Sequence, residues 1–540
     1  MKLDRNNNKN KLYIIIIVSL LFLFVVGISF AYFQTQYGNG GKVDLKAKTY
    51  SVDELSFNIG EDITLNPNQF NFAQGKGNLE GATNASAILK ANNKTHLAKM
   101  NYYAYVVVTK NEFKYTTSDK KAELVLSVEG PNGVVTTLPD LGNAIDVTDN
   151  EGNTFKAFDI TEFSGVITLA DNKEIEVTSG DNGKKQEDWK IKVTFINLDA
   201  DQSNNSDKNF NANMMIQKEK FAGTMADICK GQLLTDCVSA QYYVLKNHNG
   251  LYYHDGTITD SNSNVIDAGD NSYRYAGANP NNYICFGSDE ETCSAENLYR
   301  IIGLIDGKVK LILADGATTD MLGADGGYYN TYEGEGLVKS KYKGSGDLSK
   351  IGIYKWNKTG TNTWDDSETN LTNLNANFLT YLDGKSTQWR RMIDNTTWYI
   401  GGLYEDVALM SIPNITYSYE VGANKDESTT VTSKIGLMYI SDFFYGASKL
   451  YWTSKGSNYS GSISNNWMCI GLVEWTITSL IDSPESLDSA FRASNDGLVD
   501  SYPVKWTGYV LRPTFNLIYP ISYSSGSGTV DDPIRIQLNK

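Results

Sequence analysis

The sequence predicts an N-terminal transmembrane helix followed by an all-β sandwich and then by a larger α+β domain. Three observations predict this order: a long uncharged stretch near the N-terminus, alternating strand patterns up to residue 217, and hairpins mixed with helices after residue 221. A chain of 540 residues is also longer than one hydrophobic core usually serves. The predicted parts are a basic cytoplasmic tail (1–11), the membrane helix (12–33), a stalk (34–42), the sandwich (43–217), the α+β domain (221–535) and a C-terminal tail (536–540).

Residues 12–33 contain no charged side chain. At about 1.5 Å per residue, a helix of this length crosses the ~30 Å hydrocarbon layer of a bilayer. The basic flank before it stays in the cytoplasm, so everything after Phe33 is translocated. Ser29-Phe30-Ala31 places small residues where signal peptidase cleaves, so cleavage after Ala31 is the alternative to a retained anchor. The protein is therefore expected in the cell membrane with its C-terminal part outside, or secreted if it is cleaved.

Strand patterns recur through the predicted sandwich. Trp189–Phe195 alternates apolar and polar residues, as a half-buried strand does. The turn residues Pro131–Gly133 predict one hairpin, and the polar residues Ala170–Lys173 predict a second. The predicted strands are 102–109, 124–128, 134–135, 166–169, 175–177, 189–195 and 214–220.

The segment after residue 221 mixes hairpins with helices. Asn249-Gly250 and Asp306-Gly307 are hairpin turn signals, and they join the predicted strands 241–245, 251–253, 298–305 and 308–313. Leu371, Leu374, Phe378, Leu379 and Leu382 keep helical spacing, with Asp366 or Ser367 as the N-cap and Gly384 at the end. A shorter helix is predicted to start at Ser441 as its N-cap. This combination indicates an α+β fold.

The five cysteines suggest two local disulfides. Cys229 and Cys237 are eight residues apart, as are Cys285 and Cys293, whereas Cys469 stands alone and is expected to be a buried apolar side chain. An exported protein meets an oxidising compartment, where such pairs form disulfides. Zinc binding or free thiols are the alternatives, although no Cys-x-x-Cys pair and no histidine ligand spacing is present.

The sequence predicts no catalytic residue, no metal and no cofactor. It lacks a nucleophile elbow, a zinc-protease helix motif and a phosphate-binding loop. Residues 197–207 offer oxygen atoms at alternate positions, as a calcium loop would, but a polar surface turn explains them as well. The formal net charge of −15 argues against a nucleic-acid binder, which needs basic surface to displace counterions.

Two short motifs resemble known surface proteins. Ala31-Tyr32-Phe33 and the pair of segments 193–197 and 201–202 resemble the exported sandwich domains of Gram-positive bacteria, of which the camelysin and biofilm-fibre group is the best known. This resemblance implies a structural role at the cell surface and no active site.

The C-terminal segments resemble a bacterial C-type-lectin-like domain. The matching segments are 451–454, 465–467, 474–478, 490–492 and the closing stretch 505–515, which contains Leu511-Arg512-Pro513-Thr514. The fold is shared with formylglycine-generating enzymes and with the variable ligand-binding proteins of diversity-generating retroelements. The copper chemistry of those enzymes needs a cysteine pair where this segment has only Cys469, and the calcium-binding motifs of lectins are missing. The resemblance therefore implies a scaffold for ligand binding.

Aromatic and amide side chains in Gly/Ser/Asn-rich sequence are the candidates for ligand contact on an exposed face. They are Tyr451, Trp452, Tyr459, Asn465, Asn466 and Trp467. Core packing is the alternative for each of them, and Trp475, Phe491, Leu511 and Phe515 are predicted to fill the core. Arg512 is predicted to donate hydrogen bonds to carbonyls or a carboxylate.

These observations together predict an adhesin-like protein, anchored in the membrane, whose distal domain binds an extracellular glycan or protein. One alternative is a cell-envelope enzyme that acts on glycans through carboxylates, although the 63 Asp and Glu residues give no reason to single out a pair. Another is a structural protein that forms fibres after cleavage at Ala31.

Overall fold

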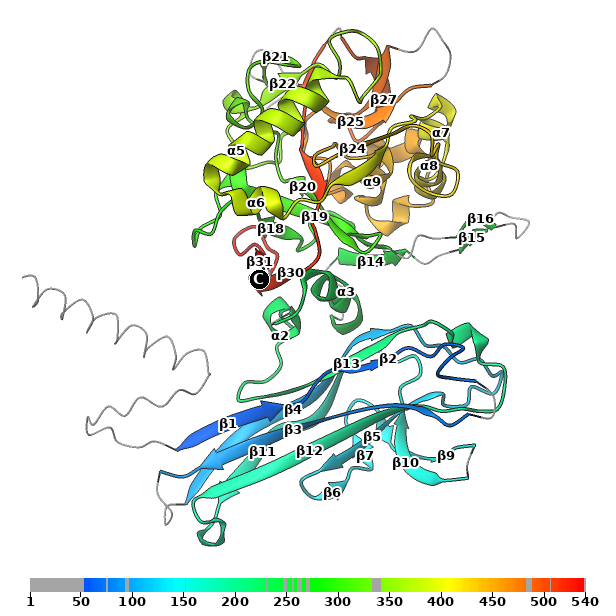
Figure 1. The fold of residues 1–540 in the computed structure, drawn as a ribbon, viewed down its shortest axis with the longest axis vertical. Helices are drawn as coiled ribbons and strands as arrows, with labels where there is room; N and C mark the ends of the chain where they lie inside the picture. The colour runs from blue at the N-terminus through cyan, green and yellow to red at the C-terminus, as the bar shows by residue number, and fades with distance from the viewer. Residues whose placement is uncertain are drawn as a thin grey trace, which may run out of the picture. The chain divides into compact units, whose positions relative to one another are not determined.

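Two antiparallel sheets form from the alternating segments before residue 218 (Figure 1). The larger sheet has the order β1 (Glu54–Ile59), β3 (Leu79–Lys90), β12 (Lys184–Phe195), β5 (Leu124–Gly130), β10 (Thr154–Asp159) and β9 (Ile145–Thr148), with β6 (Gly133–Val134) paired to β5. The smaller sheet has the order β11 (Gly165–Val177), β4 (Ala98–Asn111), β13 (Phe210–Gln217) and β2 (Ile63–Leu65). One hydrophobic core contains side chains of both sheets, among them Ala85, Val106, Trp189 and Met214.

The structure is a computed structural model, and it describes residues 53–538 with short gaps at 74–75, 93–96, 151, 230, 246–249, 255–256, 260–264, 269–271, 333–340, 482–487 and 506. The predicted membrane helix 12–33, the cleavage position Ala31 and the stalk lie outside the described residues. Within those residues, no helix is long and apolar enough to cross a bilayer. The prediction of a β-rich chain is confirmed.

One predicted hairpin in this region is confirmed and one is wrong. β5 returns through Pro131 and Asn132 to β6, as the turn residues predict. Residues 165–177, in contrast, form the single strand β11, which pairs with β4 along its whole length. The polar residues at 170–173 lie where the register shifts, and Asn172 has a positive φ of 53°. A long partner strand keeps the chain extended there, so the turn-forming residues make a bulge.

The strands after residue 250 form two larger sheets and several short ladders. The first has the order β14 (Leu251–His254), β17 (Ser272–Tyr275), β19 (Leu298–Ile305), β20 (Lys308–Leu313) and β29 (Thr514–Asn516), with β18 (Tyr283–Cys285) paired to β19. The second has the order β21 (Tyr328–Thr331), β22 (Gly352–Tyr354), β28 (Tyr509–Val510), β25 (Glu474–Ser479), β26 (Ser489–Ala493) and β27 (Val499–Pro503). The short ladders pair β15 (Thr257–Thr259) with β16 (Val265–Ala268), β23 (Thr396–Tyr399) with β24 (Thr430–Ser433), and β30 (Ile521–Ser525) with β31 (Arg535–Leu538). One further ladder, of β7 (Thr137–Leu138) with β8 (Gly142–Asn143), lies in the region before residue 218.

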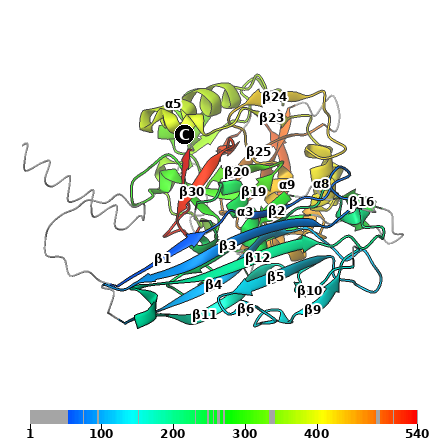
Figure 2. The same ribbon diagram turned by 60° about the horizontal axis from the view of Figure 1, so that its bottom comes forward.

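The hairpin β19–β20 is central to the region after residue 221. Its turn has positive φ angles at Asp306 (50°) and Gly307 (71°), which is the turn that the Asp-Gly pair predicts. In both views, β19 and β20 lie between α5 (Phe378–Lys385) on one side and α8 (Pro413–Glu420) with α9 (Ile440–Tyr445) on the other (Figures 1 and 2). The remaining helices are α2 (Met225–Cys229), α3 (Leu234–Val244), α4 (Thr319–Leu322), α6 (Thr387–Arg391) and α7 (Glu405–Met410).

Three local predictions in this region are wrong. Residues 241–245, predicted as a strand, belong mostly to the helix α3, because the buried positions recur at helical spacing from Leu234 to Val244 and outweigh the β-propensity of the tyrosines. Ser441 is not an N-cap: it lies inside α9, which Asp442 caps by accepting a hydrogen bond from the Tyr439 N–H at 3.0 Å. The predicted tail also starts too early, since β31 extends to Leu538.

The helix predicted around 371–382 is present, but its first turns differ from a regular α-helix. Residues 369–377 form a π-helix that continues into α5, and Ser367 caps it by accepting a hydrogen bond from the Asn370 N–H at 3.1 Å. The i→i+5 bonds of a π-helix turn each residue through a smaller angle than an α-helix does. Leu374 is therefore fully buried, whereas Leu371, predicted on the same face, is 54% exposed.

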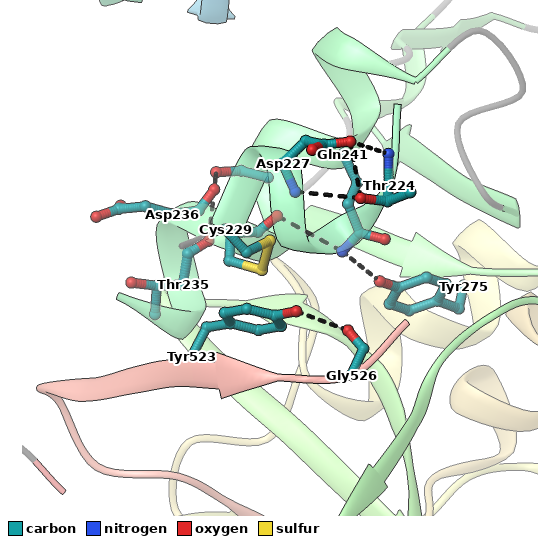
Figure 3. Close-up of a disulfide and its surroundings, with 11 residues drawn as sticks. Thr224, Asp227, Cys229, Thr235, Asp236, Gln241, Tyr275, Tyr523 and Gly526 are labelled. Atoms are coloured by element: carbon teal, nitrogen blue, oxygen red, sulfur yellow. Dashed lines mark hydrogen bonds between the residues drawn. A yellow bond between two sulfur atoms is a disulfide. The ribbon is translucent and has the colours of Figure 1, made fainter. Parts of the chain in front are cut away.

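Both predicted disulfides are present. Cys229 and Cys237 are joined at 2.03 Å and Cys285 and Cys293 at 2.06 Å, while Cys469 is free and buried. The first disulfide ties α2 to α3, and Figure 3 shows Tyr523 of β30 beside it. On α3, the Gln241 side chain donates a hydrogen bond to the Tyr275 hydroxyl at 2.9 Å (Figure 3). The residues predicted for the core, Trp475, Phe491, Leu511 and Phe515, are at most 1% exposed.

Candidate functional site

A small cavity in the region after residue 221 collects charged and aromatic side chains from separate parts of the chain. Its volume is about 280 Å³. We call it the Arg300 pocket and define it by the lining residues Arg300, Asp315, Lys343, Asn466, Trp467 and Cys469. Arg300 comes from β19, Asp315 follows β20, Lys343 precedes β22, and the other three lie between residue 465 and β25. Only the tertiary fold brings these segments together.

Arg300 is held rigidly in this pocket. Its side chain is 4% exposed, and its guanidinium carbon lies 4.2 Å from the ring centre of Tyr283 and 4.5 Å from that of Trp467. Nε donates a hydrogen bond to Asn282 Oδ1 at 2.7 Å, and Nη2 donates to the Pro280 carbonyl at 3.0 Å. Burial lowers the pKa of Arg300 to about 10, which leaves the guanidinium charged at neutral pH.

Asp315 lines the pocket and accepts three hydrogen bonds. Its Oδ1 accepts from the Gly316 N–H at 2.7 Å, and its Oδ2 accepts from the Gly346 N–H at 2.8 Å and from the Tyr342 hydroxyl. Burial, followed by the charge of Asp315, raises the pKa of Tyr342, so this hydroxyl stays protonated and remains a donor. The Asp315 carboxylate therefore fixes the loop around residue 344.

Two more lining groups differ in accessibility. Lys343 is exposed, and its Nζ donates to the Ile463 carbonyl at 2.5 Å. Cys469 is only 3% exposed, and burial is the main cause that raises the pKa of its thiol. A thiol in this environment stays protonated and is a poor nucleophile. The pocket thus offers one accessible ammonium group and an inert thiol.

Two of the six predicted ligand-contact residues belong to this pocket. Asn466 and Trp467 both line it, although they are only 1% and 3% exposed. The Trp467 indole N–H donates to the Tyr275 carbonyl at 2.7 Å. The Asn466 amide donates to the Phe443 carbonyl at 2.9 Å and accepts from the Met468 N–H at 3.0 Å. The prediction that they form an exposed face is wrong, because their polar atoms hold neighbouring backbone in place.

The structure does not bring the other four predicted residues into the pocket. Trp452 and Tyr459 are buried, so the expected exposure is wrong for them as well. The Trp452 ring packs 5.0 Å from that of Tyr445, and the Tyr459 hydroxyl donates to the Tyr451 carbonyl at 3.0 Å. Tyr451 is half-buried and Asn465 is exposed. Residues 456–465 wind into a 3-10 helix, whose turns direct Tyr459 inward despite the Gly/Ser-rich sequence.

Arg512 confirms its predicted role as a structural donor and supports the pocket. Its Nε donates to the Leu313 carbonyl at 2.8 Å and its Nη1 to the Met468 carbonyl at 3.0 Å. Nη1 also lies 3.2 Å from a carboxylate oxygen of Glu474. The closing strand motif therefore holds the segment that carries Asn466, Trp467 and Cys469.

Sequence reasoning missed Arg300, Asp315 and Lys343. A signal was present for the first two, because a charged side chain is costly to bury. Arg300 interrupts the apolar strand β19, and Asp315 comes two residues after the end of β20. Lys343 lies in a polar loop and gives no such signal. Its place in the pocket depends on the loop that Asp315 holds.

No metal site emerges from the residues that the structure describes, since no three His, Cys, Asp or Glu side chains group as ligands among them. In the segment 197–207, the oxygens that suggested calcium bind backbone N–H groups. Asn197 Oδ1 accepts from Asp199 and Asp201 Oδ1 accepts from Ser203, both at 3.0 Å. These bonds are those of a polar turn.

Comparison of the chain with protein-family models, with curated proteins and with solved structures finds no match.

Proposed function

We propose that this chain is a surface protein anchored by residues 12–33, in which a β-sandwich carries a C-type-lectin-like domain that binds an extracellular ligand. The observation that carries the proposal is the Arg300 guanidinium, fixed between the rings of Tyr283 and Trp467 at a cavity of about 280 Å³. Pockets that bind small ligands are concave and hold a few well-placed polar groups. The Arg300 pocket has this character.

The state of the lining groups favours binding over catalysis. Backbone groups already hydrogen-bond the polar side-chain atoms of Asp315, Asn466 and Trp467. A catalytic base or nucleophile needs a reactive atom within reach of substrate, and the thiol of Cys469 is kept protonated by burial. Rigid walls lower the entropy that is lost when a ligand binds. The pocket is therefore better suited to hold a ligand than to transform it.

The location outside the cell is supported by two disulfides, which persist in oxidising compartments. The uncharged segment 12–33 is the proposed tether, and the sandwich is the proposed spacer between the membrane and the ligand-binding domain. This arrangement is that of an adhesin-like protein.

Binding of the full-length protein, in detergent micelles, to an array of glycans and extracellular proteins tests the proposal. Ser345 is exposed and lines the pocket, so Ser345→Trp should fill the entrance and abolish array binding while the fold remains intact. Ser349→Trp adds the same side chain at an exposed position outside the lining and should bind as the natural protein does.

The rival functions have different readouts in the same experiment. Cleavage of a cell-wall polysaccharide without array binding would replace the binding proposal with a glycan-active enzyme. Polymerisation of the protein that starts at Tyr32, again without binding, would identify a fibre subunit.

A further inference from the structure

We infer that the Arg300 pocket selects a ligand unit that carries a carboxylate, and that this unit is an acidic sugar residue such as a uronic acid. The inference deepens the proposed function and rests on it. It follows from three properties of the pocket: its charge, its size and the chemistry of its smaller lining groups.

The charge of the pocket favours an anion. Arg300 and Lys343 are cationic and Asp315 is anionic, so these three lining groups sum to one positive charge. Asp315 already accepts three hydrogen bonds, which reduces its capacity to receive a ligand donor. The hydrogen bonds of Arg300 to protein groups use Nε and Nη2, and the rings of Tyr283 and Trp467 lie against its planar guanidinium. Nη1 is therefore the nitrogen that we assign to a ligand. Charged donors of this kind form strong hydrogen bonds with carboxylates and with phosphates.

The balance of charges also distinguishes between anions. A carboxylate carries one negative charge and matches the net charge of the three lining groups. A phosphate monoester approaches two negative charges at neutral pH and would lie beside the fixed carboxylate of Asp315. Repulsion inside a protein cavity is stronger than in bulk water, because the effective dielectric constant is lower there. A monoanion is therefore favoured over a dianion.

The size and the remaining lining groups favour a single sugar unit. A volume of about 280 Å³ lies just below the usual range for ligand pockets, which is about 300–1,000 Å³, so the pocket suits one sugar residue of a chain. The Asn279 Oδ1 accepts from Arg300 Nη2 at 3.4 Å, so the amide nitrogen of Asn279 and the hydroxyl of Ser345 are the groups that can pair with ring hydroxyls. The other walls are small apolar groups, including Ala278, Ala295, Ala314 and Val530, which leave room for a ring.

Titration of the full-length protein with glucuronic acid and with glucose tests the inference, because these sugars differ only at the group on C6. Saturation-transfer NMR and calorimetry at low salt supply the readout. We expect glucuronic acid to bind at least about tenfold more tightly than glucose, since charge-assisted hydrogen bonds to a buried cation are lost with glucose. Added salt should weaken glucuronic acid binding and leave glucose unaffected.

Variants place the binding in this pocket. Lys343→Met removes an exposed ammonium and should weaken glucuronic acid binding about three- to tenfold without changing glucose binding. Lys350→Met, at another exposed lysine outside the lining, is the matched control and should have no effect. Arg300→Lys keeps the charge but loses the planar group, and it should reduce binding further. Because Arg300 is buried, the exposed Lys343 variant is the decisive one if Arg300→Lys is poorly folded.

The outcomes separate this inference from the proposed function. Equal binding of glucose and glucuronic acid, both blocked by Ser345→Trp, would refute the acidic preference and leave the binding function standing. Tighter binding of glucose 6-phosphate, or of a peptide through its C-terminal carboxylate, would refute the sugar acid as the ligand class. Array binding that survives Ser345→Trp would exclude the pocket. No binding to any array member would overturn the proposed function itself.

Discussion

Lys310 and Asp442 form a buried ion pair, with 2.5 Å between the lysine Nζ and the aspartate Oδ2. Their side chains are 7% and 3% exposed. Arg274 approaches the other carboxylate oxygen at 3.4 Å, and the Tyr439 N–H donates to Oδ2 at 3.0 Å. One carboxylate therefore connects β20, β17 and the start of α9.

Asp442→Asn should destabilise the region after residue 221 by about 3–5 kcal/mol, because it removes the anion that pairs with the buried ammonium of Lys310. Chemical unfolding followed by tryptophan fluorescence measures this region selectively, since eight of the nine tryptophans follow residue 221. Asp394→Asn is the control: Asp394 pairs with Lys308 on the same hairpin, but the two side chains are 23% and 45% exposed. That change should cost less than about 1 kcal/mol. Equal losses for the two variants would contradict the argument.

Glu474 gives the stability of the protein a predictable dependence on pH. Burial is the largest cause that raises its pKa to about 7 from an ordinary value of 4.5, against the opposing effect of Arg512. The folded state thus holds the proton more tightly than the unfolded state, so this group stabilises the fold fully below about pH 4.5. As the pH rises from about 4.5 to about 7 this contribution is lost, which lowers the free energy of unfolding by about 3 kcal/mol in total.

Glu474→Gln should therefore flatten the decline of unfolding free energy between pH 4.5 and 7. The measurement is a series of denaturant titrations across this window. Glu427→Gln, at a side chain that is 79% exposed, should leave the slope of the natural protein unchanged. An undiminished slope in Glu474→Gln would assign the pH dependence to other groups.

The π-helical start of the helix at 369–385 predicts unequal effects for two leucines that are three residues apart. Leu374→Ala should destabilise the fold by about 2–5 kcal/mol, because its side chain is fully buried. Leu371→Ala should change the stability by less than about 0.5 kcal/mol, since its side chain is 54% exposed. Thermal and chemical unfolding of the two variants decide this. A large loss for Leu371→Ala would favour the regular α-helix that the sequence alone predicts.

The two disulfides predict a thiol count. The unfolded protein should react with a thiol reagent at one cysteine before reduction and at all five afterwards. Replacing both Cys229 and Cys237 with Ala should cost about 2–3 kcal/mol, because a loop of this length then regains its freedom in the unfolded state. Cys469→Ala should keep the natural response of stability to reductant, whereas the double variant should lose part of it.

Local structure was predictable wherever neighbouring residues decide it. The Asp306-Gly307 turn needs positive φ at two positions, and few residue pairs other than Asp-Gly adopt this without strain. Ser367 caps its helix through a bond to a residue three positions away. The eight-residue spacing of each cysteine pair brings both sulfurs within reach. Each of these features depends on contacts that are close in sequence.

Predictions failed where a distant partner overrules local preference. The polar residues 170–173 would form a turn by themselves, but pairing with β4 makes them a bulge. Trp467 occurs in polar sequence that indicates exposure, yet it is buried and its indole N–H donates to the Tyr275 carbonyl, 192 residues away along the chain. Strand and burial preferences are weak compared with the free energy of packing apolar surface.

The sequence by itself determined that the chain is rich in strands, where its main hairpin turns, which cysteines pair and that Trp475, Phe491 and Phe515 lie in the core. Periodicity, turn chemistry and spacing encode these features locally. Only the tertiary structure decided that one pocket is lined by Arg300, Asp315, Lys343 and Trp467. The first and last of these residues are more than 160 positions apart along the chain, so no local pattern relates them. Burial then fixed the guanidinium between Tyr283 and Trp467 and made it the centre of the candidate site.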